Sequence, residues 1–179
     1  YDDVVSAVNV DIGEGTVFGA DVGRDSLSGI ERVYTGRGDD VLKGSSQDDT
    51  LSGGLGDDIF WATEGDDVVL AGGGTDALYL SFGYEPVSLS VDSDTGDLTF
   101  IFRAFNSDDG QSQDHSVTVE NHLTDELSSI RIYTSSDHST FEEYGLSVSV
   151  IQLGSQTLYR ALSDVPTIFG GSAGNDALL

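Results

Sequence analysis

The chain has 179 residues, with 32 Asp and Glu against 7 Lys and Arg and a formal net charge of -25. Such a chain cannot neutralise a phosphate backbone or attach to an anionic bilayer, so nucleic acid and membrane surfaces are excluded as partners. The absence of Cys excludes disulfides, zinc-thiolate sites and a thiol nucleophile. No apolar run is long enough to span a membrane and no signal peptide is visible, and the absence of Met indicates a fragment or a processed chain.

The first 34 residues predict one strand followed by an irregular coil. Apolar and polar residues alternate between residues 4 and 12, with Val8 and Val10 on one face, which is typical of a half-buried strand. Glycines at positions 13 and 15 predict a turn after it. In the coil that follows, the core candidates are Leu27, Ile30 and Val33.

Five nonapeptides then follow one another from residue 35 to residue 79. They read TGRGDDVLK, GSSQDDTLS, GGLGDDIFW, ATEGDDVVL and AGGGTDALY. The sixth position is always Asp: Asp40, Asp49, Asp58, Asp67 and Asp76. The eighth position is always a large apolar residue, and the fourth is Gly in every repeat but the second, which has Gln47. This self-similarity predicts a solenoid.

Each repeat predicts a six-residue glycine-rich turn followed by a three-residue strand. The eighth position would line a thin apolar core between two parallel sheets, and the Asp carboxylates would stack along the edge of the coil. Stacked carboxylates repel one another unless a cation lies between them. Ca²⁺ takes roughly 6–8 oxygen ligands, backbone carbonyls included. The alternative is an acidic solenoid without metal, which the additional Asp at the fifth position of four repeats makes implausible.

These nonapeptides resemble the RTX family, the haemolysin-type calcium-binding repeats with consensus GGxGxDxUx, which residues 53–61 match at every fixed position. The resemblance implies an all-β fold in which two repeats make one turn of a parallel β-roll. It also implies calcium ions between turns on the same side, hence sites at Asp40/Asp58, Asp58/Asp76 and Asp49/Asp67 and about three ions or more. The implied carbonyl ligands are those of Thr35, Arg37, Asp39, Gly44, Ser46, Asp48, Gly53, Leu55, Asp57, Ala62, Glu64, Asp66, Ala71, Gly73 and Thr75.

The two sides of the predicted roll differ. The odd repeats (first, third and fifth) have Gly at both the second and fourth positions, whereas the even repeats have Ser45 with Gln47 and Thr63 with Gly65. If the fourth position needs a left-handed backbone, Gln47 is strained there. We therefore expect tighter binding on the odd side, where Asp58 serves two sites. The alternative is that both sides bind equally well.

The flanking segments predict caps and further β-structure. Residues 1–34 should cap the roll, and Glu31 or Asp25 is a weaker ligand candidate beside Asp49 or Asp40. Residues 80–166 predict an antiparallel β-rich region, with a hairpin across residues 94–97, a polar loop at 106–113 and strands at 117–119, 129–133, 146–151 and 156–159. Residues 167–179 fit the start of a further repeat, with Asp176 at its sixth position as a weaker ligand candidate. We therefore expect a longer parent protein.

One outer face of the roll is apolar. Ile59, Trp61 and Tyr79 occupy seventh and ninth positions of odd repeats and share that face. An apolar face of this size is rarely left bare. Either residues 80–166 pack on it, which is the expected arrangement, or it is an aromatic platform for a glycan or a partner.

No catalytic constellation is visible, so we expect no enzymatic activity. The chain lacks a GxSxG elbow, an HExxH motif and a P-loop, and His115, His122 and His138 match no metal spacing and are expected at polar surface positions. The RTX resemblance implies a calcium-binding module of a larger secreted bacterial protein, exported by type I secretion and folding on calcium outside the cell. The alternatives are a calcium-dependent adhesion or carbohydrate-binding module with a glycan or cell-surface partner, and an accessory domain of a secreted hydrolase or toxin.

Overall fold

The structure, a computed structural model, describes residues 1–161 except 2, 82, 93, 107–110, 121–126, 134–135, 146–147 and 154–155. Its described residues form strands and turns without a helix, which confirms the predicted all-β class. Consequently none of them belongs to a helix that could cross a membrane. Residues 162–179, and with them the predicted further repeat, lie outside the described residues.

The strands divide into a repeat region with its two flanks. The first nine strands are β1 (Val8–Asp11), β2 (Thr16–Gly19), β3 (Gly23–Ser26), β4 (Arg32–Tyr34), β5 (Val41–Lys43), β6 (Thr50–Ser52), β7 (Ile59–Trp61), β8 (Asp66–Leu70) and β9 (Asp76–Leu80). The remaining strands are β10 (Glu85–Val91), β11 (Leu98–Asn106), β12 (Gln111–Val119), β13 (Leu127–Tyr133), β14 (Phe141–Gly145), β15 (Val148–Leu153) and β16 (Gln156–Ala161).

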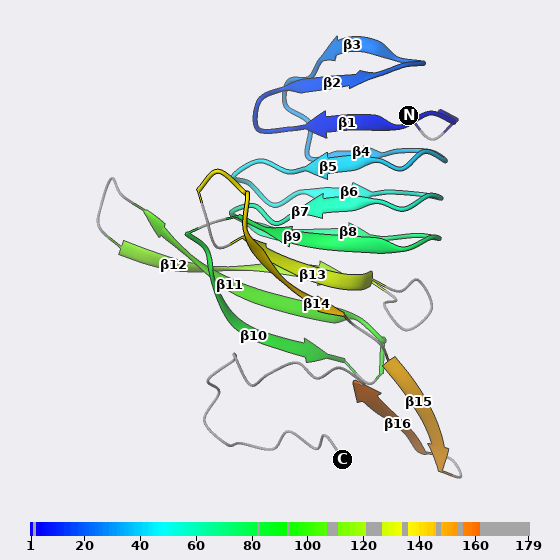
Figure 1. Ribbon diagram of the computed structural model, residues 1–179, viewed down its shortest axis with the longest axis vertical. Helices are drawn as coiled ribbons and strands as arrows, with labels where there is room; N and C mark the ends of the chain where they lie inside the picture. Colours follow the sequence, from blue (N-terminus) through cyan, green and yellow to red (C-terminus); the bar gives the residue numbers. More distant parts are fainter. Residues whose placement is uncertain are drawn as a thin grey trace.

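Consecutive nonapeptides alternate between two sheets, and each sheet stacks its strands in parallel. Strands β5, β7 and β9 of the odd repeats pair in one sheet, and β6 and β8 of the even repeats pair in the other, where β4 precedes them. Each step along a sheet is therefore two repeats, which is the arrangement of a β-roll. Figure 1 shows these short strands stacked along the long axis of the molecule.

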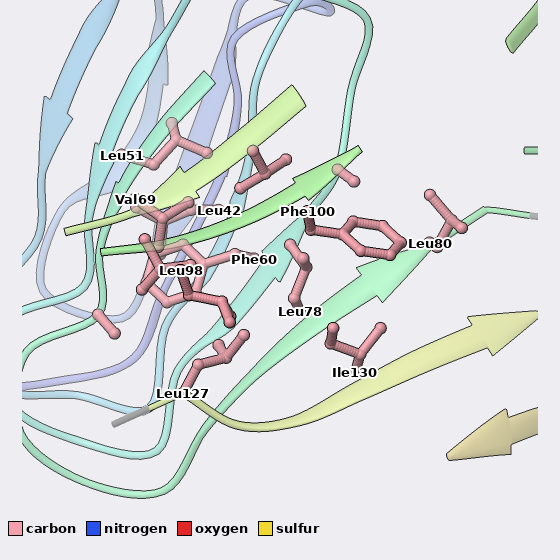
Figure 2. Packing of buried hydrophobic residues seen from close by; sticks show 14 of the residues in the cluster. Leu42, Leu51, Phe60, Val69, Leu78, Leu80, Leu98, Phe100, Leu127 and Ile130 are labelled. Atoms are coloured by element: carbon pink, nitrogen blue, oxygen red, sulfur yellow. The ribbon is translucent and has the colours of Figure 1, made fainter. Parts of the chain in front are cut away.

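The eighth positions form the core of the roll. In one sheet the register aligns Val10, Leu42, Phe60, Leu78 and Ile130, which are at most 2% exposed. In the other it aligns Val33, Leu51, Val69 and Val119, which are at most 5% exposed. Because side chains alternate between the faces of a strand, one residue per repeat enters this interior. Figure 2 shows the two sets of side chains packed against one another.

The N-terminal flank adds β4 to the sheet of the even repeats and three strands to the sheet of the odd repeats. Strand β1 pairs parallel with β5, and β2 and β3 then continue the same sheet as an antiparallel meander. Val8 and Val10 are buried as predicted, and the chain turns back after residue 11. Val33 is buried, but the prediction that Ile30 enters the core is wrong, because its side chain is 37% exposed beside the edge strand β4.

The C-terminal flank continues both sheets beyond the last nonapeptide. Strand β12 pairs parallel with β8, and β13 pairs parallel with β9, so two strands without the repeat signature occupy the next positions of the roll. The predicted hairpin is present as β10 and β11, which pair antiparallel and lead into β12. Of the segment expected to be a polar loop at 106–113, Asn106 belongs to β11 and residues 111–113 belong to β12, and residues 107–110 lie outside the described residues. Strands β15 and β16 form a separate pair.

Candidate metal centre

The five sixth-position Asp side chains are buried at the edges of the roll. All five, Asp40, Asp49, Asp58, Asp67 and Asp76, are at most 2% exposed. An ionised carboxylate is rarely buried this deeply without a partner of opposite charge, since removing it from water costs several kcal/mol or more. Two ion pairs in the described part of the chain lie elsewhere, joining Lys43 to Asp11 and Arg103 to Asp114.

One oxygen of each odd-side carboxylate is bound to the neighbouring turn. The backbone N–H of Asp40 donates to Asp58 Oδ1 at 2.8 Å, and that of Asp58 donates to Asp76 Oδ1 at 2.8 Å. The same ladder is closed at its start by the N–H of Val8, which donates to Asp40 Oδ1 at 2.7 Å. We call Asp40, Asp58 and Asp76 the odd column. Their carboxylates are thus held in a single file by backbone donors.

The second oxygen of the odd-column carboxylates has a different environment. Asp40 Oδ2 and Asp58 Oδ2 are buried and accept no hydrogen bond. A Cβ placed on Gly53 would lie 2.1 Å from Asp58 Oδ2, so this oxygen lies directly against the turn of its own repeat. Buried acceptors without donors cost about 1–3 kcal/mol each, and more when charged. A hard cation held by turn oxygens would remove this cost.

We call Asp49 and Asp67 the even column. The N–H of Asp49 donates to Asp67 Oδ1 at 3.0 Å. The Oδ2 atom of each carboxylate accepts a hydroxyl from the second position of its own repeat: Ser45 Oγ donates to Asp49 Oδ2 at 2.8 Å, and Thr63 Oγ1 donates to Asp67 Oδ2 at 2.7 Å. Asp49 Oδ1, at the start of the column, is buried and accepts no hydrogen bond. The odd repeats have Gly at this position and offer no hydroxyl.

Burial also changes the acid–base behaviour of the columns. Burial raises the pKa of Asp58 to about 7, the hydrogen bond from the Asp40 N–H opposes this, and the charges of Asp76 and Asp40 add to it. Burial likewise raises the pKa of Asp67 to about 7, against the opposing hydrogen bonds from Thr63 and Asp49. A cation between turns would favour the ionised form of these groups.

A second, exposed ladder runs along the fifth positions. The N–H of Asp57 donates to Asp39 Oδ1 at 3.0 Å, and that of Thr75 donates to Asp57 Oδ1 at 2.8 Å. On the even side the N–H of Asp66 donates to Asp48 Oδ1 at 2.9 Å. The sequence assigned only the backbone carbonyls of these residues a role; the structure shows that their side chains also join successive turns.

Glycine is required where one turn lies close to the previous one. Gly54 and Gly72 have φ values of 92° and 89°, and a Cβ on either would lie within 2.2 Å of the carbonyl oxygen one odd turn earlier. Gly65 has a φ of 106°, but Gln47, at the same position one even turn earlier, has no positive φ. The expected strain at Gln47 is therefore absent, because the positive φ belongs to the later turn of the pair.

The predicted carbonyl ligands belong to the turns that surround these carboxylates. Some of them already accept hydrogen bonds: Gly53 O accepts Thr35 Oγ1 at 2.8 Å, and Gly73 O accepts the N–H of Gly56 at 2.8 Å. The described residues contain no cluster of three or more His, Cys, Asp or Glu side chains suited to a metal. A cation here would therefore be held by carboxylates together with backbone carbonyls. This oxygen-only donor set fits Ca²⁺.

The three weaker ligand candidates differ in where they lie relative to the Asp columns. Glu31 precedes β4 in the register position that Asp49 has before β6, and its carbonyl accepts the N–H of Thr50 at 2.7 Å. Its side chain is exposed. Asp25 lies in β3, which β2 and β1 separate from β5, so it is not brought to Asp40. Asp176 lies outside the described residues.

The apolar outer face is occupied by rings from this chain. Trp61 stacks on Tyr133 with centroids 5.4 Å apart and planes 9° apart, and contacts Tyr79 edge-on at 5.3 Å. The His138 ring lies 5.4 Å from the Trp61 ring, and the Arg131 guanidinium lies 4.6 Å from the centre of Tyr79. These contacts favour packing of the C-terminal flank over an open platform made by Ile59, Trp61 and Tyr79.

The histidines differ from the expected surface positions in one case. His115 is 9% exposed, and its Nδ1 accepts the N–H of Gly65 at 2.9 Å. It thereby joins β12 to the last even turn, and Ser116 Oγ donates to Asp66 Oδ1 at 2.9 Å beside it. His138 is exposed, as predicted, and His122 lies outside the described residues.

Comparison with known proteins agrees with this geometry. The family model of the RTX calcium-binding nonapeptide repeat, in 4 copies, matches residues 25–60 and 54–84. Residues 25–84 of this chain are therefore RTX calcium-binding repeats, which confirms the predicted resemblance. The match includes residues 25–34, in agreement with the register of Glu31. This family is a calcium-binding repeat and not a catalytic one. No curated protein matches the chain.

Proposed function

We propose that this chain is a calcium-binding module of a larger secreted bacterial protein, and that it folds when it meets calcium outside the cell. The observation that carries the proposal is the buried odd column, in which Asp40 Oδ2 and Asp58 Oδ2 have no donor. Without a cation, folding buries these charges uncompensated, so the chain should stay open where calcium is scarce. With calcium, binding free energy becomes folding free energy.

The ions would lie between successive turns on the same side of the roll. The carboxylate pairs that would hold them are Asp40/Asp58 and Asp58/Asp76 on the odd side and Asp49/Asp67 on the even side, with turn carbonyls completing each shell. Each pair is already joined by one backbone-to-carboxylate hydrogen bond. The proposed ions would compensate the remaining carboxylate charge.

The flanks would serve the roll as caps. Strand β1 ends the odd column with the Val8 N–H, and β12 ends the even side with His115 and Ser116. A terminal coil of a solenoid must be covered to avoid an open edge. Export by type I secretion fits a chain that stays unfolded in calcium-poor cytosol. The proposed parent protein would supply the biological task.

Far-UV circular dichroism of the whole chain, in chelator and then in millimolar calcium, tests this function. We expect a disordered spectrum in chelator and a β spectrum in calcium, with magnesium at the same concentration much less effective. A chain that shows the same β spectrum in chelator and in calcium would not be a calcium-folded module.

A further inference from the structure

The second position of each repeat separates the two sides of the roll. On the odd side this position is Gly36, Gly54 or Gly72, and on the even side it is Ser45 or Thr63. The difference is not only one of backbone freedom, because the hydroxyls of Ser45 and Thr63 are hydrogen-bonded to the buried carboxylates of their own repeats. The glycines leave Asp40 Oδ2 and Asp58 Oδ2 without a donor.

The Thr63 hydroxyl lies in the gap between the two even carboxylates. A Cβ placed on Gly44 would be 2.6 Å from Thr63 Oγ1 and 2.9 Å from Asp49 Oδ2, so both atoms face the same glycine in the earlier turn. Thr63 Oγ1 also donates to Asp67 Oδ2 at 2.7 Å. Residue Thr63 is buried, with 7% of its surface exposed. Both oxygens of Asp67 therefore have donors, one from Thr63 and one from the Asp49 N–H.

From these contacts we infer that the second-position hydroxyls take the place of a cation on the even side. Burying a carboxylate oxygen costs much less free energy when a hydroxyl donates to it than when it has no donor. At Asp49/Asp67 both Oδ2 atoms already accept a hydroxyl, which calcium must displace, and only Asp49 Oδ1 lacks a donor. At Asp40/Asp58 both Oδ2 atoms lack a donor. The odd column should thus bind calcium tightly, and the even column weakly or not at all. This inference rests on the proposed calcium binding.

The same glycine cannot simply be exchanged for a hydroxyl on the odd side. A Cβ on Gly54 would lie 2.2 Å from Gly36 O, and a Cβ on Gly72 would lie 2.0 Å from Gly54 O. Ser45 and Thr63 have no positive φ, unlike Gly54 and Gly72. The choice between cation and hydroxyl therefore follows the backbone conformation at the second position of each side.

The test is calcium titration by calorimetry on the whole chain, comparing Thr63→Gly with Thr63→Ser. We expect Thr63→Gly to convert the even pair into an additional tight site, with an affinity gain of at least about tenfold, or about 1.4 kcal/mol. Thr63→Ser keeps the hydroxyl and should match the unaltered chain. An unchanged titration for Thr63→Gly overturns the inference.

A second pair of variants keeps the inference testable if Thr63→Gly does not fold. Asp67→Asn should leave the tight calcium ions in place, and Asp58→Asn should remove them. Equal losses of tight binding in these two variants contradict the inference while leaving calcium binding itself intact. If the unaltered chain binds no calcium at all, the proposed function fails instead.

Discussion

Asp58 Oδ1 accepts the backbone N–H of Asp40 at 2.8 Å across a sequence separation of 18 residues. This bond fixes the distance between successive odd turns and leaves the second oxygen of Asp58 buried without a donor. The backbone thus positions a carboxylate that it does not neutralise. Asp58 also bonds to the next turn through its own N–H, which donates to Asp76 Oδ1, so it is the only residue of the odd column with neighbours from the column on both sides.

Asp58→Asn should reduce calcium binding more than Asp49→Asn. Asp58 would contribute to two proposed sites, whereas Asp49 lies in one and already accepts Ser45 Oγ. We expect the Asp58 variant to raise the calcium concentration at half-folding by tenfold or more and the Asp49 variant by a few-fold, as orders of magnitude. Circular dichroism during a calcium titration measures both. The matched control is Asp94→Asn, an exposed Asp in the β10–β11 turn. Equal shifts for Asp58 and Asp49 would contradict this prediction.

The stability of the metal-free fold should fall as the pH rises from about 4 to about 7. The pKa of Asp58 and that of Asp67 are raised to about 7 from an ordinary value of 3.8, so in this window the folded chain binds more protons than the unfolded chain. Stability is then fully present below the unfolded pKa and is lost as the pH rises through the folded pKa. Far-UV circular dichroism in chelator should therefore show more β structure at pH 5 than at pH 8, where we expect a disordered chain.

The Asp58→Asn/Asp67→Asn double variant is the control for this pH effect. Asn carries no charge at either pH, so the difference between the spectra at pH 5 and pH 8 should shrink. With calcium present the sign reverses for the unaltered chain, because protons compete with the ion at both carboxylates. A metal-free chain that is more stable at pH 8 than at pH 5 would show that these two groups do not govern its folding.

Gly54→Ala should abolish or severely destabilise the calcium-loaded fold. The new Cβ would lie 2.2 Å from Gly36 O at a φ of 92°, so it meets both a backbone clash and a strained dihedral. We expect a loss of more than about 3 kcal/mol of unfolding free energy. Gly23→Ala is the matched control, with a φ of 72° but no atom within 4 Å of its Cβ. It should cost only about 1–2 kcal/mol, and similar losses for the two variants would disprove the close approach of the turns.

The repeat region could be predicted from the sequence because it repeats. The apolar residue at every eighth position indicates which face of each strand is buried. The Asp at every sixth position indicates which edge of the roll carries the carboxylates. The C-terminal continuation could not be predicted in this way. Val119 enters the same core column as Val69 from 50 residues away, but the nine residues 112–120 contain no Gly and have Val117 where a repeat has Asp. The alternation of Val117 and Val119 predicted a strand but not its partner.

Two local errors have physical explanations. Gln47 is unstrained because the positive φ is imposed on the later of two stacked turns, and this depends on a contact that one repeat alone does not reveal. His115 is buried because its Nδ1 satisfies the N–H of Gly65, which in an uninterrupted roll would face another turn. Its signal was the alternation of β12, in which His115, Val117 and Val119 face the same side.

Trp61→Ala should destabilise the fold through lost packing. The Trp61 ring contacts Tyr79, Tyr133 and His138, so its removal weakens the packing of the C-terminal flank on the roll. We expect a loss of about 3–5 kcal/mol in calcium, measured by denaturant unfolding. Phe18→Ala, at a side chain that is 48% exposed, should change the free energy by no more than about 0.5 kcal/mol. A stable Trp61 variant that had lost binding to a glycan would instead support the platform interpretation.

The central claim is that calcium folds this chain by compensating buried carboxylates. Its most direct test is a calcium titration of the whole chain followed by far-UV circular dichroism, starting in chelator at pH 8. We predict a cooperative change from a disordered spectrum to a β spectrum in calcium, with the midpoint for Asp58→Asn shifted to a much higher calcium concentration. A β spectrum that is already complete in chelator and does not respond to calcium would contradict it.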